Sequence, residues 1–167
     1  MMELVKTLRQ EHDEIWAFTE RMQQMCVDFM ENNQFDEQAF RQAIQFIREF
    51  ADKEHHQKEE RLLFRAMTDE LGSLAVNLIQ HGMLVEHDQA RLYVSDLEQA
   101  VTAYAQTEEA VHKLNILANA TSYCAHIRRH IEKENDAVYP FAERSLKPET
   151  IAALEQEFAL EQQNKNN

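Results

Sequence analysis

The chain has 167 residues, a length that suits one domain with a buried core. It holds only 2 glycines and 2 prolines, so it can make few turns, which excludes an all-β sandwich or barrel and favours long helices. The 30 acidic and 17 basic side chains give a net charge of −13, which disfavours nucleic acids and anionic membranes as partners, because their phosphates bind Lys and Arg.

Two cysteines, Cys26 and Cys124, lie far apart and form no C-x-x-C motif, which favours a reducing compartment. The first residues carry charges and no apolar run, so we expect no signal peptide. The longest uncharged stretch, 71–85, is too short and too polar to span a bilayer. We therefore expect a cytoplasmic location and no membrane partner, and the pattern indicates no particular protein partner.

Apolar residues that recur every three or four positions predict helices along most of the chain. Asp36 is expected to cap the second helix, and Gly72 and Gly82 to interrupt the chain. Thr107 reads as a helix start, and Pro140 as the point where that helix kinks or ends. The expected helices lie at about 2–30, 36–67, 74–80, 83–104, 107–139 and 148–162.

Long helices joined by short loops are typical of an all-α fold, the up-down antiparallel four-helix bundle, here with a short C-terminal helix. We expect a single domain over 1–167, with the bundle at about 4–145 and the last helix at about 148–162. A coiled-coil dimer of helical hairpins is the structural alternative, but the connection between the second and third long helices fits it poorly.

Histidines and glutamates interrupt the apolar stripes of all four long helices. Burying a carboxylate without a partner costs several kcal/mol or shifts its pKa, so two carboxylates beside four imidazoles indicate a bound cation. One core histidine on its own would more simply be a hydrogen-bonded structural residue. The residues on the stripes are His12, His55, Glu59, His87, His130 and Glu134.

These six residues form an internal repeat. His12, His55 and Glu59 recur 75 positions later as His87, His130 and Glu134. In each His-x3-Glu pair the two side chains share one helix face, the spacing that a common metal centre needs. The repeat predicts two metal ions per chain, each held by two histidines, with both glutamates bridging.

Mixed imidazole and carboxylate ligands suit iron, manganese or zinc. A structural zinc site would be closed and would usually include cysteine. We expect two iron ions with carboxylate and oxo or hydroxo bridges, and rank manganese and zinc below iron. A ferritin-type site needs Glu-x-x-His, but the residues three before the histidines are Arg9, Asp52, Leu84 and Ile127.

Four stretches of the chain together resemble the hemerythrin-like (HHE cation-binding) family, over about residues 4–145. They are 8–12 (LRQEH), 55–64 (HHQKEERLLF), 86–91 (EHDQAR) and 123–140. The resemblance implies an up-down bundle with a non-haem di-iron centre that reacts with O₂, NO or peroxide. Oxygen-carrying hemerythrins have a fifth histidine four residues from the third, where this chain has Met83 and Arg91. The chain is closer to the four-histidine, two-glutamate branch, which argues against reversible O₂ carriage.

Four further residues are weighed against simpler roles. His126, four residues before His130, is either an additional ligand or lies at the rim of the site. Glu60 either orients a ligand histidine from outside or is solvated. Tyr123 either donates a hydrogen bond into the site or lines an access path to it, or else packs in the core. His56 lies off the stripe, so a place outside the ligands or at the surface is expected ahead of a ligand role.

Two functions fit this centre. The first is a non-enzymatic di-iron protein that senses or binds O₂, NO or peroxide, or responds to stress. The alternative is a metal-dependent enzyme or repair factor that decomposes peroxide or NO or donates iron to iron–sulfur clusters. No side chain reads as a dedicated general acid or base, so the chemistry in either case belongs to the metal. Metal storage ranks last, since one site per chain stores little.

Overall fold

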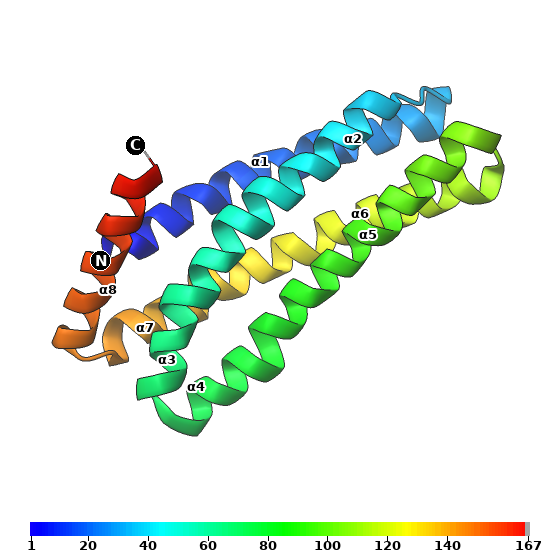
Figure 1. Ribbon diagram of the computed structural model, residues 1–167. Helices are drawn as coiled ribbons and strands as arrows, with labels where there is room; N and C mark the ends of the chain where they lie inside the picture. Colours follow the sequence, from blue (N-terminus) through cyan, green and yellow to red (C-terminus); the bar gives the residue numbers. More distant parts are fainter. Residues whose placement is uncertain (166–167) are drawn as a thin grey trace.

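The computed structural model describes residues 1–165, and every regular element in that range is helical (Figure 1). Four long helical arms lie side by side, over residues 3–32, 37–70, 72–107 and 110–145. Three of them contain π-helical segments, labelled η. The elements in chain order are α1 (Glu3–Asn32), α2 (Glu37–Phe46), η1 (Ile47–His56), η2 (Glu59–Phe64), α3 (Arg65–Glu70), α4 (Gly72–Leu78), η3 (Ile79–Met83), α5 (Leu84–Thr107), α6 (Ala110–Lys133), η4 (Glu134–Val138), α7 (Tyr139–Ser145) and α8 (Pro148–Lys165).

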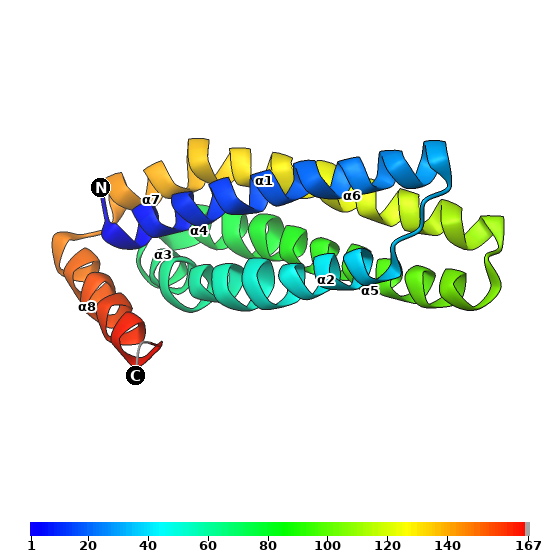
Figure 2. The same cartoon turned by 90° about the horizontal axis from the view of Figure 1, so that it is seen from above.

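The arms pack into a helical bundle, which confirms the all-α class. Helix α6 packs on both α5 and α1, and α2 packs on α5. Helix α8 crosses the end of the bundle that holds the N-terminus, where it contacts α1 and η2 (Figure 2). Within the described residues 1–165, none of the helices is long and apolar enough to cross a membrane.

Two hydrophobic clusters fill the bundle, one on each side of a polar layer. In the first arm Leu8 belongs to one cluster and Ile15 to the other, and the buried His12 lies between them. The other three arms repeat this order, with buried polar residues between members of the two clusters. The polar layer is therefore enclosed by apolar packing at both ends.

The second arm begins as predicted, but the next helix does not break where expected. The Asp36 carboxylate caps α2 by accepting a hydrogen bond from the Ala39 N–H at 2.9 Å. The chain turns between Leu71 and Gly72, which has a φ of 72°, close to the predicted interruption. The expected break at Gly82 is wrong, because the helix continues through it. Packing of the neighbouring buried residues outweighs the ~1 kcal/mol that glycine costs inside a helix.

One further expected helix start is wrong, and Pro140, expected to kink or end its helix, does not end it. Thr107 is the last residue of α5 and not a helix start; α6 begins at Ala110. Pro140 does not end its helix, which continues to Ser145. The turn before Pro140 is π-helical, and the Tyr139 N–H bonds to the carbonyl five residues back. This wider turn makes room for the proline ring.

Candidate metal centre

The six residues predicted from the stripes converge in the polar layer. Their helices differ, yet none of the six residues is more than 1% exposed. Helix α1 supplies His12, η1 and η2 supply His55 and Glu59, α5 supplies His87, and α6 and η4 supply His130 and Glu134.

Each glutamate contacts one imidazole from each half of the sequence, the placement that a bridging carboxylate needs. Glu134 Oε2 lies 3.2 Å from His12 Nε2, and Glu134 Oε1 lies 3.2 Å from His130 Nε2. The equivalent contacts of the other glutamate are Glu59 Oε2 to His55 Nε2 at 3.6 Å and to His87 Nε2 at 3.5 Å.

Two overlapping groups of side chains have donor atoms close enough to hold a cation each. Within a group, one donor atom from each residue lies within 4.8 Å of the others. Glu59 belongs to both groups, so the two positions are adjacent. One group is His12, His55, Glu59 and Glu134, and the other is His56, Glu59, His87 and His130.

Several contacts among these donor atoms are unfavourable unless a cation lies between them. Glu59 Oε2 and both oxygens of Glu134 are buried without a hydrogen-bond donor, which costs about 1–3 kcal/mol for each such group. His87 Nε2 and His130 Nε2 face each other at 3.1 Å. When both imidazoles are neutral with the proton on Nδ1, these two lone pairs repel. Cations in this layer would satisfy all of these atoms.

An outer layer of oxygen atoms fixes the imidazoles. His55 Nδ1 lies 2.9 Å from Glu11 Oε2, and His130 Nδ1 lies 2.9 Å from Glu86 Oε2. An ionised carboxylate only accepts hydrogen bonds, so Nδ1 carries the proton and donates it, and the inward Nε2 is left able to bind a cation. The remaining pairs are His12 Nδ1 with Asn135 Oδ1 at 3.1 Å and His87 Nδ1 with Glu60 Oε1 at 2.8 Å.

The sequence repeat extends into this outer layer. Glu11 and Glu86 are 75 positions apart, and each pairs with a lysine, Lys58 or Lys133, that is also 75 positions from its counterpart. The sequence analysis gave these two glutamates no role. Their place in the repeat was the signal that could have found them.

Without metal, protons bound by these side chains compensate the buried negative charge. Burial raises the pKa of Glu59, and the nearby charge of Glu134 raises it further. Burial also raises the pKa of Glu134, but the charge of His130 and the close approach of the His12, His130 and His87 imidazoles outweigh this and leave it well below its usual value. Burial lowers the pKa of His130, yet Glu134 and Glu86 raise it to about 9. Two adjacent ionised carboxylates are thus avoided.

Tyr139 is a contact of the centre that sequence reasoning missed. Its hydroxyl donates a hydrogen bond to Glu59 Oε1 at 2.5 Å and lies 3.3 Å from His12 Nε2. Burial and the charge of Glu59 raise the pKa of Tyr139 well above its usual value, so the hydroxyl keeps its proton. Its counterpart 75 positions earlier is Phe64, which has no hydroxyl. This difference within the repeat was the sequence signal that Tyr139 places a polar group at a buried position.

Glu60 and His126 both lie beside the two groups that could hold cations and belong to neither. Glu60 accepts hydrogen bonds from His87 Nδ1 and from Arg91, each at 2.8 Å, and so orients the imidazole as the first of its two expected roles requires. His126 Nε2 lies 2.8 Å from the carbonyl oxygen of Glu86, to which it donates. This nitrogen is therefore directed at the backbone of α5.

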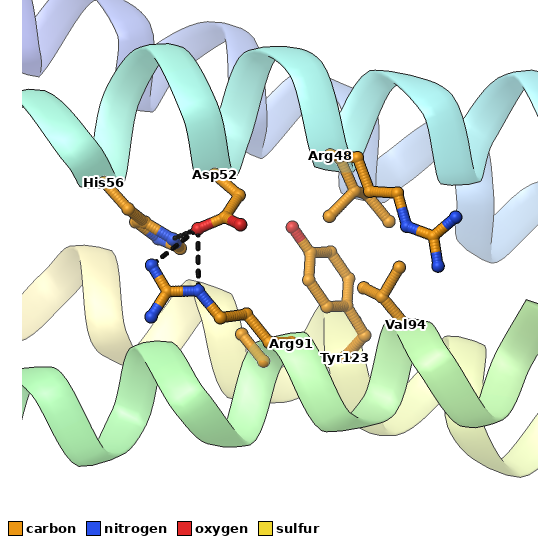
Figure 3. Close-up of a pocket in the computed structure, with 8 residues that line it drawn as sticks. Arg48, Asp52, His56, Arg91, Val94 and Tyr123 are labelled. Carbon is orange, nitrogen blue, oxygen red and sulfur yellow. Dashed lines mark hydrogen bonds and ion pairs between the residues drawn. The ribbon is translucent and has the colours of Figure 1, made fainter.

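Tyr123 and His56 line a cavity of about 140 Å³ beside the centre (Figure 3). Tyr123 is buried, and its hydroxyl has no hydrogen-bond partner, so it lies in the core and donates nothing into the site. His56 is only 2% exposed, so the surface position that was one of its expected places is wrong, and it joins one of the two groups that could hold a cation.

The π-helical winding explains why His56 was undervalued. The stripes assumed 3.6 residues per turn, but η1, η2 and η4 are wound more widely, with hydrogen bonds to the fifth residue back. His55, His56, Glu59 and Glu134 all lie in these segments. Such segments occur frequently at functional sites, and the adjacent pair of histidines was the sequence signal available.

A comparison with protein families agrees with a cation-binding site in the polar layer. A family model described as hemerythrin HHE cation binding domain matches residues 3–142, which contain the whole polar layer. None of the curated proteins gives a significant match.

Proposed function

Because the chain belongs to the hemerythrin HHE cation-binding domain family, we propose that it is a non-haem di-iron protein whose centre reacts with O₂, NO or peroxide. The observation that carries the proposal is the pair Glu59 and Glu134. Both are fully buried, both have unpartnered oxygens, and each faces imidazoles from both halves of the chain. Buried carboxylates of this kind need compensating positive charge.

The proposed ligands divide between two ions. His12 and His55 hold one iron, His87 and His130 hold the other, and the two glutamates are shared. The absence of cysteine argues against a structural zinc site, and a dinuclear carboxylate-bridged site in a helical bundle favours iron first and manganese second. When bound, ferrous iron supplies the electrons for chemistry with a small oxidant or diatomic molecule.

The surrounding residues position the ligands and control access. The outer oxygens hold each Nδ1 proton and so direct Nε2 inward. The two hydrophobic clusters limit water at the centre, which strengthens its electrostatic interactions. The Tyr139 hydroxyl keeps a proton beside Glu59 Oε1. The cavity of about 140 Å³ beside the centre suits small molecules.

The proposal also includes the architecture of the whole chain. We take residues 1–167 as one domain in which the arms form an up-down antiparallel four-helix bundle. Short connections between consecutive arms support this topology.

The test is metal content together with the visible spectrum. The protein is loaded anaerobically with ferrous iron, and two irons per chain and a spectral change on exposure to air are expected. Glu59→Gln should lose at least one iron, whereas Glu132→Gln, on the exposed face of α6, should keep both. One iron per chain in the wild type, or no response to O₂, NO or peroxide, would refute the proposal. Consumption of many peroxide molecules per iron pair would favour the enzymatic alternative.

A further inference from the structure

The internal repeat is broken at one polar pair beside the centre. His56 and Asp52 lie in η1, and the residues 75 positions later are Ile131 and Ile127. Both isoleucines are buried in a hydrophobic cluster. One half of the bundle therefore places an imidazole and a carboxylate where the other half places only hydrocarbon, so the two cation positions have different surroundings.

His56 has the surroundings of a ligand rather than of a core residue. Neither ring nitrogen makes a hydrogen bond, although the residue is 2% exposed. His56 Nδ1 lies 3.5 Å from Asp52 Oδ1, and Arg91 Nε donates to the same oxygen at 2.9 Å (Figure 3). The ring stacks on His87, with centroids 3.9 Å apart. An oxygen acceptor beside Nδ1 is also the arrangement of the other four imidazoles: a carboxylate for His55, His87 and His130 and the Asn135 amide oxygen for His12.

We propose that His56 is a fifth imidazole ligand, bound to the same ion as His87 and His130. The inference rests on the proposed function, since it assigns a ligand to one of the two proposed ions. A nitrogen of His56 lies within 4.8 Å of donor atoms of Glu59, His87 and His130. Its carboxylate partner Asp52 would hold the Nδ1 proton and direct Nε2 to the ion.

His126 shows what a nearby histidine looks like when it is not a ligand. Its ring centroid is 6.4 Å from that of His130, so it is close to the centre. Its Nε2, however, donates to the Glu86 carbonyl at 2.8 Å. His126 is therefore a matched control for His56: an imidazole near the same ion with its nitrogen already used.

The inference makes the two ions unequal. Three imidazoles, those of His56, His87 and His130, would hold one ion, and two, those of His12 and His55, would hold the other. The side with fewer protein ligands would leave more room for a small exogenous molecule, so His12 and His55 would border the place where O₂, NO or peroxide reacts.

The first experiment uses the unmodified protein loaded with cobalt(II). Each ligating imidazole contributes one exchangeable N–H proton with a strong paramagnetic shift, protected here by its outer oxygen. The proton spectrum should show five such signals, and four would overturn the proposal. His56→Phe should remove one signal, and His126→Phe none.

The second experiment separates ligation from folding. In a chelator competition, His56→Phe should weaken one of the two cobalt ions at least ~10-fold and leave the other within about two-fold. The melting temperature of its metal-free form should stay the same or rise, because two buried unpartnered nitrogens are removed. Unchanged affinities with a lower metal-free melting temperature would make His56 structural and refute the inference. A wild type that binds fewer than two ions would instead refute the proposed function.

Discussion

Replacing Tyr139 with phenylalanine tests how the buried carboxylates are stabilised. The substitution removes one hydroxyl and leaves the ring, which stacks on His12 with centroids 5.4 Å apart. Tyr139 is the hydrogen-bond donor to Glu59 Oε1, and the other oxygen of that carboxylate, Oε2, already has no donor. Both residues are fully buried, so water cannot replace the lost hydroxyl.

The expected loss is about 2 kcal/mol of unfolding free energy in the metal-free protein. This follows from leaving one buried acceptor without a donor, for which about 1–3 kcal/mol is typical. For a chain of this length it corresponds to a fall in melting temperature of about 4–8 °C. In the metal-loaded protein the fall should be less than half as large, because a cation then compensates the Glu59 oxygens.

The assay is thermal unfolding followed by circular dichroism, with and without metal. The matched control is Tyr123→Phe, which removes a buried hydroxyl that has no partner and should leave the melting temperature unchanged or slightly higher. If Tyr139→Phe and Tyr123→Phe behave alike in the metal-free protein, the hydroxyl does not stabilise Glu59. Equal losses with and without metal would show that no cation reaches that carboxylate.

Three further predictions follow from the same contacts. Removing the metals by chelation should lower the melting temperature by about 10 °C or more, given two ions each present at about 100 times their dissociation constant. Glu59→Ala should abolish most of this difference in melting temperature between the metal-loaded and metal-free proteins. In the metal-free protein, burial lowers the pKa of His56 to about 3, so below pH 6.5 only the unfolded chain takes up a proton at this residue. Between pH 6.5 and 5 the unfolding free energy of the wild type should therefore fall by about 2 kcal/mol more than that of His56→Phe, as measured by urea titration. Arg91→Met, which loses bonds to three carboxylates, should lower the unfolding free energy by at least ~1 kcal/mol in the same titration, whereas Arg48→Met, in an exposed pair, should change it by less than about 1 kcal/mol.

The positions of the six proposed ligands could be predicted from the sequence because two independent patterns agree on them. The apolar period places His12 and His87 on inward faces, and the 75-residue repeat gives each a counterpart. The apolar period depends on the winding of each helix, but the 75-residue repeat does not, and the two together mark the same residues. The fold class followed from the same periodicity and from the near absence of glycine and proline.

The remaining features depend on contacts between arms, which the spacing of apolar residues along one helix does not describe. Glu86 reaches His130 from a different helix, and only the assembled bundle shows which carboxylate supports which imidazole. The π-helical turns shift the inward face, which brings in His56 and lets Pro140 stay inside a helix. Gly82 stays helical because tertiary packing outweighs its low propensity.

The difference between the two ions arises where the repeat fails, and it fails on opposite sides. Tyr139 stacks on His12, while its counterpart Phe64 lies against His87 with ring centroids 5.8 Å apart and offers no hydroxyl. His56 stacks on His87. One ion would therefore gain a ligand, and the other has a proton donor nearby but one ligand fewer. A molecule bound to the ion beside His12 would meet that hydroxyl, whereas a fully repeated centre would offer both ions the same surroundings and no preference between them.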